Sequence, residues 1–299
     1  MVRHCSALHH VLNAARAMYA LLKGPKSEVE LTPPYQPALE SKVLDYEERV
    51  IKWHSVGVKR NALFYRFRSP SDEEDCKVSM VPDACVNLLF ACCPDNPGAT
   101  LSGVQLRPVE VQLKPNMEYF GFKPYSDRGF KEGKLPLTSL VDSSVDLLEL
   151  LPMAETLISG LMEAQAKGLL ESMALFDAFA KKNLVESEYQ PSFVDFFTLL
   201  LCSSGGMTDL EEMQRMTGYS KRYCRERFKA DHGITPKQYS TIMRFQGTLK
   251  QLMRGGEGSL TSLAANNGYF DQAHFIHDFR HFTNQSPSRF RKEHLIIGA

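Results

Sequence analysis

Hydrophobic positions recur every three or four residues in the last third of the chain, which is the spacing of amphipathic helices. Leu210 and Met213 begin one such stretch, and Cys224 with Phe228 forms a second apolar stripe. A longer stretch keeps the same spacing from Tyr239 to Met253 and ends at two consecutive glycines. The pattern therefore predicts a region built of helices, one of which is long.

The pattern differs upstream. Residues 1–23 have helical spacing, and residues 24–40 are rich in glycine and proline, as in a linker or extended arm. Residues 50–130 contain short strand-like runs between turn clusters, namely ALFYRF, KVSMVP, ACVNLLFACC, LSGVQL and VEVQL. Helical spacing returns from Leu135 to about Cys202, in SVDLLELL, in AETLISGLMEAQAKGLLESMALFDAFAKKNL and in PSFVDFFTLLL.

These elements predict an α+β N-terminal domain, with an antiparallel β-rich unit and flanking helices, followed by an all-α domain. The expected boundaries are 1–40 for an N-terminal helix and arm, 41–184 for the β-rich domain and 185–299 for the helical domain. With 299 residues, the chain is long enough for two domains that each bury a core.

The helical domain contains the same unit twice. Phe228 and Phe279 lie 51 positions apart, and Gly218 and Gly268 lie 50 apart. Each copy has a glycine-aromatic turn, a short helix with a buried Phe, and then Ser or Thr followed by Pro. Such self-similarity indicates one supersecondary unit used twice, and helix-turn-helix is the unit that fits.

In the first copy, Thr208 and Glu211 have the spacing of a capping box, Gly218 supplies the turn, and Ser220 caps the second helix. Cys224 and Phe228 form its buried stripe. The other side of this predicted recognition helix carries Arg222, Arg225, Glu226 and Lys229. Arginine is the commonest specific base reader, because its planar fork matches the O6 and N7 atoms of guanine.

In the second copy, Ser259 caps a helix in which the small Ala264 allows close packing, and the helix after the turn buries Phe275 and Phe279. Its polar face carries Gln272, His274, His277 and His281. The continuous spacing between the copies predicts one long helix that fixes the separation of the two modules.

Composition adds a modest signal. The whole chain has 35 basic and 35 acidic residues, but residues 207–299 carry 14 basic against 9 acidic ones, a balance of +5. A basic C-terminal unit suits nucleic-acid binding. The seven cysteines show no CxxC pair, and no apolar run is long enough for a membrane helix, so we expect a cytoplasmic protein with reduced thiols.

The double unit resembles the AraC/XylS family of bacterial transcription regulators. The second copy, SLTSLAANNGYFDQAHFIHDFRHFTNQSP, is the more similar, and Arg244-Phe245-Gln246 is similar to the linker helix of one subgroup. The resemblance covers about residues 191–293, whereas VPDACVNLLF and GVQLRPVEV resemble the family's β-rich domain only loosely. It implies a regulator whose two recognition helices, about 220–230 and 271–281, read adjacent major-groove segments.

The resemblance implies double-stranded DNA as a partner, with RNA polymerase, a small-molecule effector of unknown identity and a second copy of the chain as further candidates. The predicted DNA-binding residues are Ser220, Lys221, Arg222, Arg225, Glu226, Lys229, Arg244, Gln272, Ala273, His274, His277 and Arg280. Among them, Lys221, Lys229 and Arg280 are expected at phosphates, and the residues expected at base edges are Arg222, Arg225, His274, His277 and Gln272. No enzyme or cofactor is predicted, because the sequence contains no catalytic or nucleotide-binding motif. No metal site is predicted, because His277 and His281 have no third ligand.

Two alternatives remain open at this point. Some proteins join such a DNA-binding unit to a thiol that accepts alkyl damage, which here would require an activated cysteine among Cys76, Cys85, Cys92 and Cys93. The fold could also be a protein-interaction scaffold that has lost base readout. Three residues are consistent with such a scaffold. The Ala273 side chain cannot hydrogen-bond a base, Glu226 could pair with a neighbouring arginine, and Gln214 stands where the family typically has a small residue.

Overall fold

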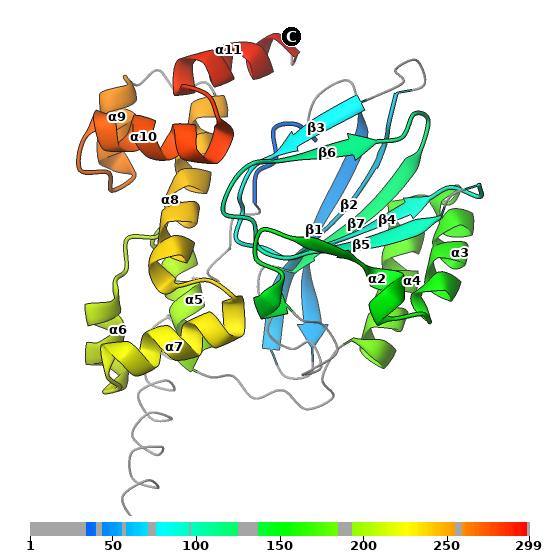
Figure 1. Ribbon diagram of the computed structural model, residues 1–299, viewed down its shortest axis with the longest axis horizontal. Coiled ribbons are helices and arrows are strands. Elements are labelled where there is room, and N and C mark those ends of the chain that lie inside the picture. The colour runs from blue at the N-terminus through cyan, green and yellow to red at the C-terminus, as the bar shows by residue number, and fades with distance from the viewer. Residues whose placement is uncertain are drawn as a thin grey trace, which may run out of the picture.

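The computed structural model describes residues 34–39, 44–55, 58–70, 76–95, 97–124, 137–184, 193–254 and 259–297. The predicted helix at 1–23 lies outside these residues. The described residues form an antiparallel β domain with helices, followed by a helical domain, which confirms the predicted fold class (Figure 1).

The N-terminal domain holds two antiparallel sheets. The larger has the strand order β1-β2-β7-β4-β5-β8, and the smaller pairs β3 with β6. The strands are β1 (Asp45–Ser55), β2 (Val58–Arg68), β3 (Cys76–Met80), β4 (Asn87–Cys92), β5 (Gly98–Ser102), β6 (Val109–Leu113), β7 (Glu118–Pro124) and β8 (Ser144–Asp146).

Alternate residues of β2 enter two different cores, because successive side chains of a strand point to opposite faces. Phe64 lies in a cluster of phenylalanines with Phe122 of β7 and Phe176 of α4. Leu63 and Tyr65 face the other way, into the cluster that contains the smaller sheet. The larger sheet is therefore covered on both faces.

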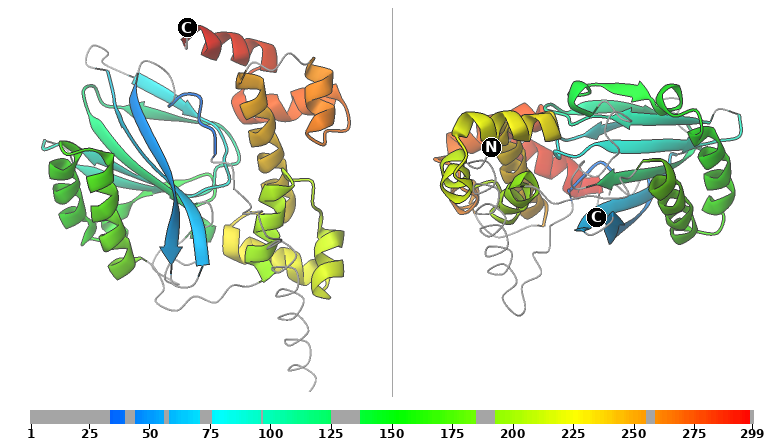
Figure 2. Two further views of the ribbon diagram at one scale, coloured as in Figure 1. Left: turned by 180° about the vertical axis from the view of Figure 1, so that it is seen from behind. Right: turned by 90° about the horizontal axis from the view of Figure 1, so that it is seen from below.

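The described helices of the N-terminal part are the 3-10 helix η1 (Leu137–Ser139), then α2 (Leu147–Leu150), α3 (Ala154–Gln165) and α4 (Leu169–Asn183). Helices α3 and α4 pack on one side of the sheet, and the C-terminal domain lies on the other side (Figure 2). The C-terminal helices are α5 (Phe193–Ser203), α6 (Leu210–Thr217), α7 (Lys221–His232), α8 (Pro236–Met253), α9 (Leu260–Asn266), α10 (Gln272–Thr283) and α11 (Pro287–Ile297).

Four details of the sequence-based prediction were wrong or incomplete. Strands β1 and β7 were not among the predicted runs; β7 is buried on both faces and so shows no alternation of polar and apolar residues. The run LSGVQL is a strand only in its first two residues. Residues 144–146 form strand β8 where a helix was expected. The long helical run from Ala154 breaks at Gly168, whose φ of 110° ends one helix before the next begins.

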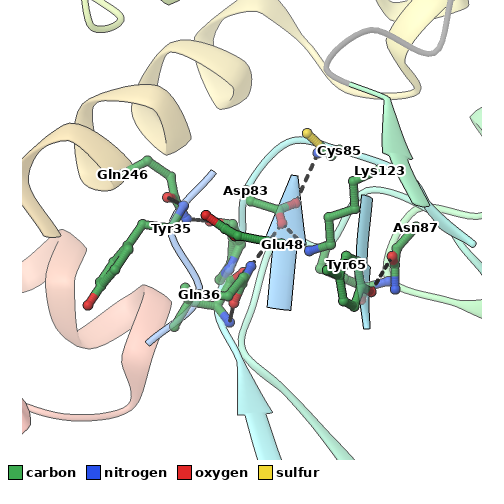
Figure 3. A network of polar contacts seen from close by, with 12 residues as sticks. Tyr35, Gln36, Glu48, Tyr65, Asp83, Cys85, Asn87, Lys123 and Gln246 are labelled. Carbon is green, nitrogen blue, oxygen red and sulfur yellow. Dashed lines mark hydrogen bonds and ion pairs between the residues drawn. The ribbon is translucent and has the colours of Figure 1, made fainter. Parts of the chain in front are cut away.

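A polar network joins the two domains (Figure 3). Gln246 of α8 accepts a hydrogen bond from the backbone N–H of Tyr35 (2.8 Å) and donates one to the backbone carbonyl of Pro82 (2.7 Å). The residue after Pro82 is Asp83, whose carboxylate pairs with the Lys123 ammonium group at 2.5 Å, and both side chains are buried. The long linker helix is thus attached to the N-terminal part of the chain by one buried and one half-buried hydrogen bond as well as by apolar packing.

The apolar part of this contact comes from the loops of the β domain. Val81, Val86 and Val104 belong to the same buried cluster as Phe245 and Leu249 of α8. The 3-10 helix η1 lies against α7. One continuous core therefore runs from the β domain into the helical domain.

Candidate DNA-binding surface

The first helix-turn-helix consists of α6 and α7. Its first helix is capped by Asp209, whose carboxylate accepts from the N–H of Glu212 at 2.8 Å, so the predicted cap at Thr208 was wrong by one residue. Gly218 closes the helix in the left-handed conformation, with φ of 71°. Ser220 caps α7, as predicted, and accepts from the N–H of Tyr223 at 3.2 Å.

Helix α7 has one buried and one exposed face. Cys224 and Phe228 are completely buried, which confirms the predicted stripe. The exposed face presents Lys221, Arg222, Arg225, Glu226 and Lys229. This division follows from the helical period, since residues four apart share a face.

Arg222 and Arg225 differ from the neighbouring Lys221 in whether they form an ion pair. Lys221 pairs with Glu211 of α6 at 2.5 Å. Across the part of the chain that the structure describes, neither Arg222 nor Arg225 forms an ion pair, with Glu226 or with any other carboxylate. Their guanidinium groups are accordingly available to an external acceptor.

The second helix-turn-helix consists of α9 and α10. Ser259 caps α9, as predicted, and Asp271 caps α10 by accepting from the N–H of His274 at 2.7 Å. Phe275 and Phe279 are completely buried. Asn284 ends α10 with φ of 58°, a conformation that asparagine adopts more readily than most residues.

The outward face of α10 carries a mixed set of side chains. Ala273, His274, His277 and Arg280 are exposed, whereas Gln272 is half-buried and accepts from the Thr261 hydroxyl at 2.7 Å. Asp278 lies between the two histidines, 3.6 Å from His274 Nε2 and 3.5 Å from His277 Nδ1. Sequence reasoning did not identify this aspartate, although its i+4 spacing from His274 is readable in the sequence.

The linker helix α8 carries both modules. Thr235 caps it in a complete capping box with Gln238, and Pro236 occupies its first position. Helix α8 is uninterrupted over 18 residues, which confirms the predicted single helix. The modules pack at its two ends (Figure 1).

Arg244 occupies a different place from the other predicted DNA-binding residues. It is half-buried in the middle of α8, where its guanidinium lies over the Tyr269 ring at 5.4 Å and Nη2 donates to the Gly206 carbonyl at 3.5 Å. The structure thus places Arg244 between the two modules and apart from the exposed faces of α7 and α10. Contact between Arg244 and DNA stays a prediction.

The described thiols of Cys92 and Cys202 have pKa values shifted away from activation. Burial raises the pKa of Cys92 to about 12 and that of Cys202 to about 11. A nucleophilic thiol needs the opposite shift, toward the thiolate. Among the described residues, no group of three or more His, Cys, Asp or Glu could hold a metal ion. No helix in the described ranges is long and apolar enough to span a membrane.

This geometry defines a protein with two helix-turn-helix modules on one linker helix. A family model described as a helix-turn-helix domain matches residues 213–293. An uncharacterised HTH-type transcriptional regulator of Staphylococcus aureus strain MSSA476 is 27% identical over 88 residues, which are 29% of this chain and 12% of that protein. The matched segment spans both modules and the linker helix between them, so this C-terminal region is similar to the helix-turn-helix domains of transcriptional regulators.

Solved structures of this kind are more distant. ToxT from Vibrio cholerae O395 is 11% identical, covers 84% of this chain and 98% of its own, and superposes with a TM-score of 0.39. An AraC family transcriptional regulator from Rhodopseudomonas palustris CGA009 is 20% identical, covers 34% of this chain and 93% of its own, and has a TM-score of 0.30. The chain spans only about an eighth of the length of the curated relatives that it matches.

Proposed function

We propose that the protein is a sequence-specific DNA-binding transcription regulator that reads two adjacent major-groove segments. The observation that carries this proposal is the pair of exposed recognition-helix faces, held at the two ends of one 18-residue helix. At 1.5 Å per residue such a helix is about 27 Å long. This length is comparable with the roughly 34 Å between successive major-groove faces on one side of the duplex.

In the first module, the base readers are Arg222 and Arg225, because both are exposed and neither is engaged by a carboxylate in the described structure. Lys221 and Lys229 neutralise phosphates, which sets affinity and its dependence on salt. Glu226 accepts from a cytosine amino group.

In the second module, His274 and His277 read bases together with Gln272. Ala273 contacts a thymine methyl group, and Arg280 contacts a phosphate. Because a rigid linker joins the modules, one molecule covers both segments, and its site does not have to be palindromic.

The N-terminal domain senses an effector or mediates assembly in this proposal. Its contact with α8 through Gln246 gives it a physical route to the DNA-binding modules. RNA polymerase and a second copy of the chain are proposed as partners, and the cytoplasm as location.

The test is selection and sequencing of random duplexes bound by the full chain, repeated with Arg225→Ala. We expect two sequence blocks about one helical turn apart for the wild type, with base preference relaxed in one block for the variant. Losing a bidentate arginine contact costs about 1–3 kcal/mol, which is a roughly 5- to 150-fold loss of affinity for the preferred sequence. Arg49→Ala, at an exposed position of β1, is the matched control and leaves the motif unchanged.

The rival reading, a scaffold without base readout, gives a different result. It predicts no motif and only weak binding that disappears at moderate salt, for wild type and variant alike. An alkyl-accepting enzyme would need an activated cysteine among Cys76, Cys85, Cys92 and Cys93, and burial shifts the pKa of Cys92 in the opposite direction.

A further inference from the structure

The two copies of the helix-turn-helix differ in the length of their turns. In the first, one residue, Tyr219, lies between the turn glycine Gly218 and the N-cap Ser220. In the second, two residues, Tyr269 and Phe270, lie between Gly268 and the N-cap Asp271. The second turn thus holds one additional residue directly before the recognition helix, and that residue is Phe270.

Phe270 is 93% exposed, more than any other large hydrophobic residue in the described part of the chain. A residue at this position often packs on the first turn of the following helix. Here Tyr269 occupies that place, with its ring 5.3 Å from the Phe275 ring, and the structure shows no ring contact for Phe270 within the described residues. The fold therefore makes no use of this side chain.

In the first module, the aromatic residues around the turn contact other aromatic rings of the domain. Tyr219, which precedes the N-cap Ser220, lies 5.2 Å from the Phe193 ring and 4.8 Å from the Tyr223 ring. Tyr223 is partly exposed, but it remains within this group of rings. Phe270 is accordingly not a repeated structural element of the fold.

The position of Phe270 indicates what it contacts. The N-terminal end of a recognition helix is the part that enters the major groove. Phe270 stands directly before the N-cap of α10. The turn between α9 and α10 lies on the side of the helical domain that is away from the β-sheets (Figure 1). Exposed Ala273 lies in the first turn of the same helix.

We propose that Phe270 is a specificity-determining residue of the second module that packs on the C5-methyl group of a thymine. This inference rests on the proposed DNA-binding function. The major groove exposes one apolar group, the thymine methyl, and phenylalanine is among the side chains that contact it. A protein partner fits less well, because protein interfaces bury contiguous patches of several hundred Å², whereas Phe270 is a single exposed ring.

The test uses the full chain and duplexes that carry its selected motif. At each thymine of the second block, deoxyuridine replaces thymidine in turn, which removes only the methyl group. We expect one replacement to lower wild-type affinity about fourfold, the factor that corresponds to ~0.8 kcal/mol for one buried carbon. Phe270→Ser is expected to be insensitive to that replacement, and Phe270→Leu to keep part of the sensitivity.

Leu170→Ser is the matched control, since Leu170 is 64% exposed on α4 of the other domain, and it keeps the full wild-type sensitivity. Because Phe270 is exposed, Phe270→Ser leaves the thermal unfolding midpoint unchanged. The inference is overturned if Phe270→Ser retains the fourfold effect, or if it weakens all duplexes equally. It is also overturned if the variant binds DNA normally but fails to support transcription by RNA polymerase, which would assign Phe270 to a protein contact.

The failure of the proposed function would look different. A wild-type chain that selects no motif would overturn the function and this inference together. A wild-type motif without any methyl effect would overturn the inference alone.

Discussion

Replacing Gln246 by leucine tests whether the linker helix is physically joined to the N-terminal domain. Gln246 is 7% exposed, and its amide forms a half-buried hydrogen bond with the N–H of Tyr35 and a buried one with the carbonyl of Pro82. Leucine is similar in size but offers neither a donor nor an acceptor. Each buried group that loses its partner costs about 1–3 kcal/mol, and the apolar leucine offsets part of this. We expect the free energy of unfolding to fall by about 2–4 kcal/mol.

The assay is urea unfolding followed by two signals. Hydrogen exchange of the backbone amides of β2 and β7 reports on the larger sheet, and circular dichroism at 222 nm reports mainly on the helices. The two transitions coincide in a protein that unfolds cooperatively. In Gln246→Leu we expect them to separate, because the contact that couples the domains is weakened.

Gln251→Leu is the matched control on the same helix. Gln251 is exposed and shares two amide hydrogen bonds with Asn267. Water replaces these bonds readily, so we expect a loss of only about 0.5 kcal/mol and coincident transitions. The reasoning is refuted if Gln246→Leu lowers the free energy of unfolding no more than Gln251→Leu does.

Two further predictions concern stability. Gly206→Ala should destabilise the fold by more than about 2 kcal/mol, because a Cβ there would lie 2.1 Å from a backbone oxygen of α8 at a φ of 79°; Gly205→Ala, at φ of 60° but with open space around it, should cost about 1 kcal/mol in the same thermal unfolding assay. Burial alone would lower the pKa of Lys123, but Asp83, together with Tyr65 and Cys85, raises it above the ordinary value of 10.5. The native state then holds this proton more tightly than the unfolded chain, so the stabilisation is complete below about pH 10 and is lost as the pH rises further. Urea unfolding from pH 8 to 11 should show this alkaline loss, and a Lys123→Met variant, already destabilised at pH 8, should show less of it.

Local physical chemistry made much of the helical domain predictable. Ser220, Thr235 and Ser259 each precede a stretch with helical spacing, and each caps the helix that follows. Cys224 and Phe228 are four residues apart and therefore share the buried face of their helix. These are interactions within a few residues, and the sequence states them directly. The off-by-one error at Thr208 has the same origin, since Asp209 is an equally good local cap.

The N-terminal sheets were less predictable. Strand β7 is buried on both faces, so it lacks the alternation that identifies a strand, and its assignment depends on partners β2 and β4. Strand β8 is three residues long and exists only because β5 lies beside it. Strand pairing joins residues that are distant in the chain, and hydrophobic periodicity carries no information about it.

By itself the sequence determined the repeated unit, the linker helix, and which residues of α7 and α10 face outward, because a helix places its side chains by its own period. Only the tertiary structure decided what those side chains meet. In the folded protein, Arg244 lies over the Tyr269 ring, and Asp278 lies close to both His274 and His277. Gln246 donates a hydrogen bond to the carbonyl of Pro82. The tertiary structure also left Phe270 in solvent. Each of these outcomes depends on the packing of one element against another, and such contacts form only when the whole chain has folded.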